Sequence, residues 1–291
     1  MTGAAQAALL ADGRRLHLQH GPIDIIAEAF GDPEEVCRAY GQATTRFRTV
    51  LAELVAELAI LRQPITAAGL AVEGAVARRM VAAVWPYRGQ FVTPMAAVAG
   101  AVADELLAAM LAGRTLARAY VNDGGDIALH LAPGERLAAG LVTNADAPQL
   151  DGKVELDHAM PVRGLATSGW RGRSFSLGIA DAVTALAASA AAADAAATLI
   201  ANAVDCDHRA IVRAPAKALR DDTDLGDLLV TVGVGALPAA AIERALEQGA
   251  GRAEEFRRAG LIFGASLVLQ GRVKIVGPLR TNLSRVAGWT I

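Results

Sequence analysis

The spacing of hydrophobic side chains changes along the chain, and each change predicts an element. Residues 14–29 alternate around a His-Gly-Pro turn, which predicts two short strands. Over residues 33–61 apolar side chains recur at helical spacing, which predicts one long amphipathic helix. Residues 72–84 predict a second helix, and Pro94 suits the first position of a third. The first third of the chain therefore combines a strand pair with helices.

The remainder of the chain is predicted to mix strands with two helices. The predicted strands are residues 117–122, 126–131, 136–144, 160–167, 210–214 and 227–235. An alanine-rich stretch over residues 182–204 predicts a buried helix, and residues 238–260 predict an amphipathic one. Residues 261–277 predict a hairpin about Gly271. The order indicates the α+β class, with residues 1–291 forming one domain or two closely packed lobes.

Composition excludes several classes of function. The 291 residues carry a formal net charge of −2 and no basic block, so a nucleic-acid partner is not expected. Cys37 and Cys206 are far apart and lack a neighbouring thiol or histidine pair, which predicts two buried free thiols rather than a disulfide or a zinc site. The first residues lack a secretory pattern, so we expect a cytoplasmic protein.

Two apolar runs, residues 91–112 and 182–204, are long enough to raise the possibility of membrane spans. Asp104 and Glu105 interrupt the first run. Asp194 lies in the second, where a buried aspartate costs about 2.5–3.5 kcal/mol on insertion scales. We therefore expect core helices and no membrane contact, and the alanine-rich surfaces predict a homodimer.

The alanine run carries polar side chains at regular intervals. Asp194, Thr198 and Asn202 follow one another by four residues, which places them within an arc of about 80° on a helix, with Thr184 at its edge. A carboxylate and a hydroxyl one turn apart suit a hard cation such as Mg²⁺. The alternative is that Asp194 caps a neighbouring loop and Thr198 bonds back to its own helix.

A first glycine-rich segment follows a predicted strand. Asn122, Gly124, Gly125 and Asp126 lie in the sequence Asn-Asp-Gly-Gly-Asp. The simple interpretation is a hairpin turn. The functional interpretation is a backbone that approaches a phosphate or a ring, with Asn122 or Asp126 as a polar contact.

A second glycine-rich segment covers residues 166–174 and contains Thr167, Ser168, Gly169 and Arg171. Such a loop can hold a phosphate through backbone amides and guanidinium charge. The alternative is a surface loop whose arginines pair with carboxylates.

These segments together resemble the ApbE-like superfamily of flavin transferases, and most closely its uncharacterised cytoplasmic branch. The family's Ala-Asp-Ala-x-x-Thr helix motif matches residues 193–198, its Gly-Gly-Asp turn matches residues 124–126, and its Ala-Thr-Ser-Gly segment matches residues 166–169. Its Gly-x-x-x-Asp helix is similar to Gly100 and Asp104. The resemblance implies an ApbE-like, T-fold-related architecture in which antiparallel sheets pack on helices.

The resemblance also implies a site. It places the Mg²⁺ ligands on Asp194 and Thr198, and it implies FAD or another phosphate-bearing nucleotide as the ligand. Metal-assisted cleavage or transfer at a diphosphate is the chemistry that it suggests. No residue is an obvious general base, and Asp181 and Asp104 are the candidates. A non-catalytic cofactor-binding or accessory protein, or a structural subunit, is the alternative.

The chain departs from the transferase pattern in two places. Ala99 stands where the transferases have lysine before the glycine of the Gly-x-x-x-Asp element. Residues 176–182 lack the histidine and proline of the family's His-Ile-x-Asp-Pro stretch. The sequence therefore predicts a retained scaffold and cation site and leaves open whether the chain is an enzyme.

Overall fold

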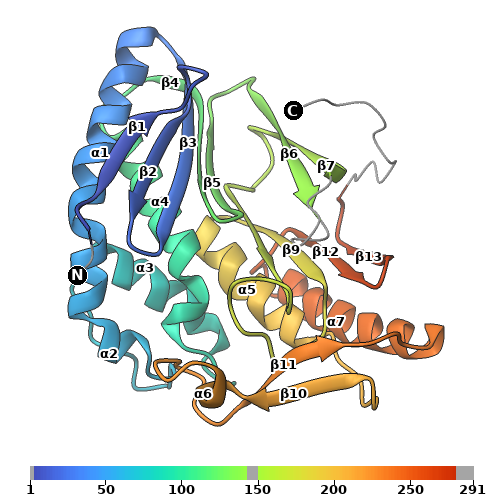
Figure 1. The fold of residues 1–291 in the computed structure, drawn as a ribbon. Coiled ribbons are helices and arrows are strands. Elements are labelled where there is room, and N and C mark those ends of the chain that lie inside the picture. Colours follow the sequence, from blue (N-terminus) through green and yellow to red (C-terminus); the bar gives the residue numbers. More distant parts are fainter. Residues whose placement is uncertain (1–2, 143–149, 280–291) are drawn as a thin grey trace. The chain divides into compact units, whose positions relative to one another are not determined.

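The computed structural model describes residues 3–142 and 150–279, which fold as two compact units (Figure 1). The first unit comprises Met1–Arg136, Asp157–Ala166 and Ala187–Ala195. The second comprises Leu137–Leu156, Thr167–Leu186 and Ala196–Ile291. Each unit thus combines segments that are distant in sequence.

The first unit is built on an antiparallel sheet whose strands neighbour one another in the order β1-β2-β3-β4-β5-β8. These strands are β1 (Gln6–Leu9), β2 (Leu16–His20), β3 (Ile23–Gly31), β4 (Leu116–Asp123), β5 (Asp126–Leu131) and β8 (Gly164–Ser168). Alternate residues of β3, among them Ile23, Ile25 and Ala27, are buried, as expected for a sheet with one face on the core.

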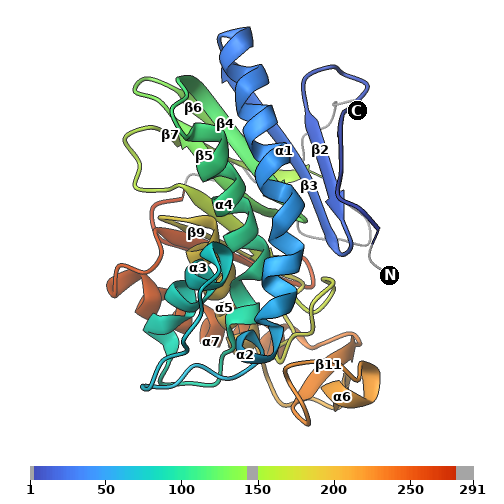
Figure 2. The same ribbon diagram turned by 90° about the vertical axis from the view of Figure 1, so that its left-hand side faces the viewer.

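The helices of the first unit pack against this sheet or against one another. They are α1 (Pro33–Ala56), α2 (Leu58–Leu61), α3 (Ala75–Val84), the 3₁₀ turns η1 (Trp85–Tyr87) and η2 (Pro94–Ala97), and α4 (Val98–Leu111). Helix α4 packs on β4 and β5, and α1 packs on β2, β3 and α4, so that α1 and α4 run beside each other in Figure 2. Fully buried Leu106 and Met110 anchor α4 in this core.

The stretch Pro94–Leu111 is, among the described residues, the one helical segment long and apolar enough to cross a membrane by length and composition. Half of it is buried inside the protein, and a core helix passes the same test. Packing of α4 on β4 and β5 accounts for its apolar side chains.

The second unit contains the antiparallel strands β9, β12 and β13, with helix α7 packed on β12 and β13. Two further two-stranded sheets pair β6 with β7 and β10 with β11. The bounds are β6 (Arg136–Val142), β7 (Leu150–Asp157), β9 (Ala182–Ala187), β10 (Ile211–Pro215), α6 (Ala216–Leu219), β11 (Leu229–Val234), α7 (Ala239–Arg258), β12 (Gly264–Leu269) and β13 (Arg272–Val276). Helix α5 (Ala190–Ala203) begins in the first unit, and its later residues are assigned to the second.

The structure confirms the α+β class with antiparallel sheets, and most predicted elements are present. Gly124 and Gly125, which have φ values of 65° and 112°, form the predicted turn between β4 and β5. The hairpin of β12 and β13 turns at Gln270 and Gly271, as predicted. Strands β1 and β7 and the short helix α6 were not predicted.

The prediction of one helix over residues 182–204 is wrong in its first part. Residues Ala182–Ala187 form β9, in which Val183 pairs with Leu267 and Thr184 with Ser266 of β12. β-Branched side chains at these two positions favour a strand, and non-local pairing outweighs the helix propensity of the alanines. Thr184 therefore does not share a helical face with Asp194.

The long helix predicted over residues 33–61 is interrupted at Glu57. This residue separates α1 from α2, and its carboxylate accepts hydrogen bonds from the Glu73 and Gly74 amides at 2.6 and 3.0 Å.

The prediction that both cysteines are buried is wrong. Cys37 is exposed and Cys206 is half-buried, although both are free thiols.

Candidate functional site

The first turn of helix α5 lies in unusually close backbone contact with its neighbours in the first unit. A Cβ atom added to Gly100 of α4 would lie 2.3 Å from the Ala190 carbonyl oxygen. A Cβ atom added to Gly164 of β8 would lie 2.1 Å from the Ala190 amide nitrogen. Only glycine permits such approaches, because real Cβ atoms do not come so close to backbone atoms.

Two aspartates connect helices α4 and α5 reciprocally. The carboxylate of Asp104 on α4 accepts hydrogen bonds from the Ala190 and Ala191 amides at 3.0 and 2.9 Å. The carboxylate of Asp194 on α5 accepts a hydrogen bond from the Gly100 amide at 3.1 Å. Because the first amides of a helix have no partner within that helix, each carboxylate caps the first turn of the other helix.

The environment of Asp194 concentrates negative charge. Burial is the main reason that the pKa of Asp194 is raised well above its ordinary value, and the charges of Asp126 and Asp123 raise it further. The amides of Gly100 and Ala99 act in the opposite direction. Asp194 nevertheless keeps part of its surface exposed. Neighbouring carboxylates that raise the pKa of Asp194 in this way provide an environment that a bound cation would stabilise.

The neighbouring turn brings the other two carboxylates to this end of the first unit. Asp123 and Asp126 are the cross-strand pair that closes the β4–β5 hairpin, and Asp123 is only 5% exposed. The side-chain oxygen of Asn122 accepts a hydrogen bond from the Gly125 amide at 2.8 Å, so this oxygen holds the turn. The structure therefore brings Asp126 close enough to Asp194 to affect its ionisation.

The second glycine-rich segment is held by Asp181 within the second unit. The Oδ1 atom of Asp181 accepts from Trp170 Nε1 at 3.2 Å and from Arg171 Nε at 3.0 Å, and its Oδ2 atom accepts from the Gln270 amide at 2.5 Å. Backbone contact is close here too, because a Cβ atom on Gly169 would lie 2.5 Å from the Asp181 carbonyl oxygen. Arg171 thus pairs with a carboxylate, as the simpler interpretation of this loop expected.

Four further predicted or neighbouring polar residues have defined partners or positions. The hydroxyl oxygens of Thr167 and Thr184 lie 2.8 Å apart. Asn202 Oδ1 accepts from the Leu177 amide at 2.9 Å and from Ser176 Oγ at 3.2 Å, so this oxygen holds a loop rather than facing a cation. Thr198 follows Asp194 by one helical turn on α5 and is half-buried.

Asp194 and Thr198 offer a carboxylate and a hydroxyl oxygen one turn apart on α5, which are hard donors that suit Mg²⁺. Among residues 3–142 and 150–279 there is no group of three or more His, Cys, Asp or Glu side chains that could hold a metal ion. Mg²⁺ usually keeps several waters and binds through one or two carboxylates and ligand phosphates, so it does not require such a group.

The sequence patterns missed Asp123 and Ser189 as contributors to this region, and they indicated Gly100 only through its resemblance to the family's Gly-x-x-x-Asp helix. Asp123 was interpreted only as a turn residue. Ser189 Oγ accepts from the Ala192 amide at 3.2 Å, and a serine before a helical run is the usual signal for such a cap. The hydrogen bond from the Gly100 amide to Asp194 joins residues 94 positions apart, so no local sequence pattern predicts it.

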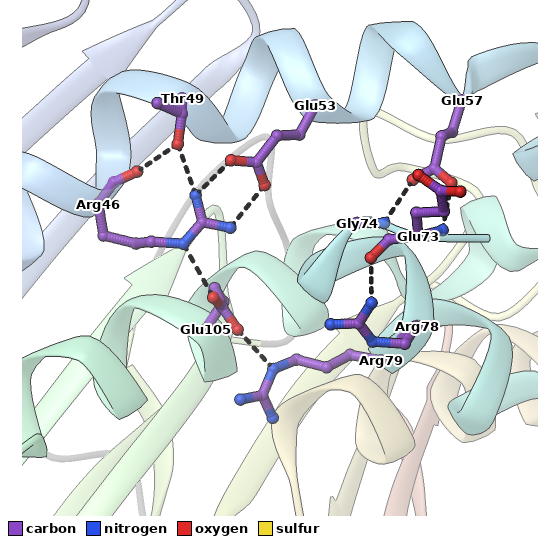
Figure 3. A network of polar contacts seen from close by, with 9 residues as sticks. All are labelled: Arg46, Thr49, Glu53, Glu57, Glu73, Gly74, Arg78, Arg79 and Glu105. Atoms are coloured by element: carbon purple, nitrogen blue, oxygen red, sulfur yellow. Dashed lines mark hydrogen bonds and ion pairs between the residues drawn. The ribbon is translucent and has the colours of Figure 1, made fainter.

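A charged network around Glu105 of α4 connects this helix to α1 and α3 (Figure 3). Glu105 accepts from Arg46 Nε at 2.8 Å and from Arg79 Nε at 2.9 Å. Arg46 also forms a two-pronged ion pair with Glu53. Burial acts to raise the pKa of Glu105, but the hydrogen bonds and charges of Arg46 and Arg79 prevail and lower it.

We expect Glu105→Gln to lower the free energy of unfolding at pH 7 by about 2 kcal/mol, since charged hydrogen bonds are lost. The lowered pKa of Glu105 means that its contribution is complete above its ordinary value of 4.5 and is lost as the pH falls through the folded-state pKa. Urea unfolding at pH 7 and at steps below pH 4.5 measures this. The difference between variant and native protein should shrink on acidification, and a constant difference would contradict the assignment.

Comparisons with known proteins agree with the resemblance seen in the sequence. A family model described as "AbpE bacteria" matches residues 7–275. A UPF0280 protein of Methanopyrus kandleri is 38% identical over 159 residues, which are 54% of this chain and 61% of the relative. A UPF0280 protein of Methanothermobacter thermautotrophicus is 40% identical over 117 residues, or 39% of this chain and 43% of the relative. The chain thus spans less than two thirds of the length of these relatives.

Solved structures show a more distant similarity. The ApbE protein of Thermotoga maritima has 12% sequence identity and a TM-score of 0.48, covering 94% of this chain and 96% of that one. The flavin transferase ApbE of Vibrio cholerae has 13% identity and a TM-score of 0.41, covering 94% and 97% of the two chains. No residue of this chain is assigned a role from these structures.

Proposed function

The chain belongs to the family described as AbpE bacteria, and from that premise we propose that it binds Mg²⁺ together with a flavin nucleotide or another phosphate-bearing nucleotide. Asp194 and Thr198 are the proposed protein ligands of the cation. The observation that carries the proposal is the position of Asp194 on α5, where burial and the charges of Asp126 and Asp123 combine against its ionised form. A divalent cation would stabilise that form.

The proposed role of each group follows from the side chains present. When bound, Mg²⁺ would neutralise charge on the diphosphate of the nucleotide. Asp194 would supply the carboxylate, and Thr198 a neutral oxygen one turn further along the same helix. The Gly124–Gly125 turn has no side chain that would obstruct a ligand beside Asp126. Binding roles for Asn122, Thr167, Ser168, Gly169 and Arg171 remain predictions.

Binding without catalysis is the second candidate, and the surroundings of the two candidate bases favour it. Both oxygens of Asp104 accept helix amides, and both oxygens of Asp181 accept hydrogen bonds from its own unit. Each carboxylate therefore already has a structural role. We assign neither as a general base in this proposal.

Incubation of the protein with FAD and Mg²⁺, followed by chromatography of the nucleotide, separates the two candidates. An enzyme that hydrolyses the diphosphate adds one water and releases FMN and AMP in equal amounts. A binding protein retains FAD in a Mg²⁺-dependent manner and returns it intact. Failure to retain or convert FAD or ATP, with Mg²⁺ or without it, would contradict the proposed function.

A further inference from the structure

We propose that Asp104 is a positioning residue for the cation site, because it fixes the start of α5 so that Asp194 faces the first turn of α4. The expected effect on cation affinity rests on the proposed function. The structural content of the inference, the placement of the Asp194 carboxylate by Asp104, can be tested without any metal.

The two-pronged contact of Asp104 restricts how α5 can move. Its two oxygens accept the Ala190 and Ala191 amides separately, at 3.0 and 2.9 Å. Two successive amides of a helix lie about 100° apart around the axis, so a bond to each opposes both rotation and sliding of the first turn. Asp194 follows Ala190 by four residues, one turn further along.

The position of Asp194 depends on that restriction. Its contact with the Gly100 amide, at 3.1 Å, joins α5 back to the first turn of α4. One turn of α4 separates Gly100 from Asp104, and one turn of α5 separates Ala190 from Asp194. Gly100, Asp104, Ala190 and Asp194 therefore form a ring of contacts between α4 and α5. Loss of the Asp104 contacts with α5 would weaken the hydrogen bond between Asp194 and the Gly100 amide.

The residue next to Asp104 provides a matched control. Glu105 is also a carboxylate of α4 with charged partners, but these are Arg46 of α1 and Arg79 of α3 (Figure 3). Neither partner belongs to α5. Glu105→Gln therefore removes a comparable charge from the same helix and leaves both hydrogen bonds from the α5 amides to Asp104 in place.

The first readout is hydrogen exchange of the Gly100 amide in Asp104→Asn and Glu105→Gln, each corrected for global stability measured by urea unfolding. In asparagine one of the two oxygens that accept the α5 amides is replaced by an NH₂ group, which donates and cannot accept. We expect exchange at Gly100 to rise at least about tenfold in Asp104→Asn beyond the global effect, and not in Glu105→Gln. Equal exchange at Gly100 in the two variants would overturn the inference.

The second readout is Mn²⁺ binding, followed by electron paramagnetic resonance of the free ion. We expect a Kd about 10–100-fold higher in Asp104→Asn, the usual effect of losing a residue that orients a ligand, and a change below about threefold in Glu105→Gln. Native protein that does not bind Mn²⁺ would contradict the proposed function, while the Gly100 exchange would still test the role of Asp104. Native binding that both variants weaken equally would contradict the inference alone.

If Asp104→Asn does not fold, the same measurement on Asp104→Glu tests the inference. Glutamate retains a carboxylate for the α5 amides but is one methylene longer, so the start of α5 must shift. We expect a folded protein in which the Gly100 amide again exchanges faster than in Glu105→Gln. Native-like protection of Gly100 in a folded Asp104→Glu would count against a positioning role.

Discussion

Replacement of Asp194 by asparagine is expected to weaken Mn²⁺ binding by at least about 100-fold, since even the loss of an outer-shell partner costs about 10–100-fold. Asparagine retains an oxygen that can accept the Gly100 amide, and it removes a charge placed near Asp126 and Asp123. The helix and its packing should therefore survive, and the midpoint of thermal unfolding should stay within a few degrees of the native value.

Mn²⁺ titration of the native protein and of Asp194→Asn measures this effect. Asp24→Asn is a suitable control, because Asp24 is an exposed carboxylate of the first unit whose partner is His17 rather than a residue of α4 or α5. Native affinity is expected in the control. Undiminished affinity in Asp194→Asn would show that the cation binds elsewhere.

Gly100→Ala is expected to destabilise the protein by about 3 kcal/mol or more, at the upper end of the usual cost of overpacking. The added Cβ would lie 2.3 Å from the Ala190 carbonyl oxygen, and backbone atoms cannot turn aside as a flexible side chain can. Separation of α4 from α5 would also break the contacts of Asp104 with Ala190 and of Asp194 with Gly100. Mn²⁺ affinity should therefore fall together with stability.

Gly41→Ala is the matched control for this prediction. Gly41 also lies within a helix, α1, but a Cβ atom there would meet nothing within 4 Å. Since alanine is favoured over glycine inside a helix by about 1 kcal/mol, this variant should be slightly more stable than the native protein. Urea unfolding compares the two variants, and a near-neutral Gly100→Ala would contradict the close approach of α4 and α5.

Local patterns predicted those parts of the fold that depend on neighbours in sequence. The glycine turn between β4 and β5 and the hairpin at Gly271 follow from residues that tolerate positive φ. The helical face that joins Asp194 to Thr198 follows from spacing alone. These predictions needed no knowledge of tertiary contacts.

The contacts that define the candidate site could not be predicted in this way. Asp104 meets Ala190 across 86 residues, and the strand conformation of Ala182–Ala187 depends on pairing with β12. Gly100 has ordinary helical surroundings in sequence, and only the approach of Ala190 explains why it has no side chain. The resemblance to family motifs identified Asp194 and matched Gly100 and Asp104, but it did not predict the contact of Asp104 with the start of α5.

The most direct test of the central claim is anomalous X-ray scattering from crystals of the protein grown with Mn²⁺ and a non-hydrolysable diphosphate nucleotide. The account predicts an anomalous peak about 2 Å from an Asp194 carboxylate oxygen, the distance expected for a Mg²⁺-type site. A peak bound to other residues, or crystals that contain the nucleotide without any peak beside Asp194, would contradict it.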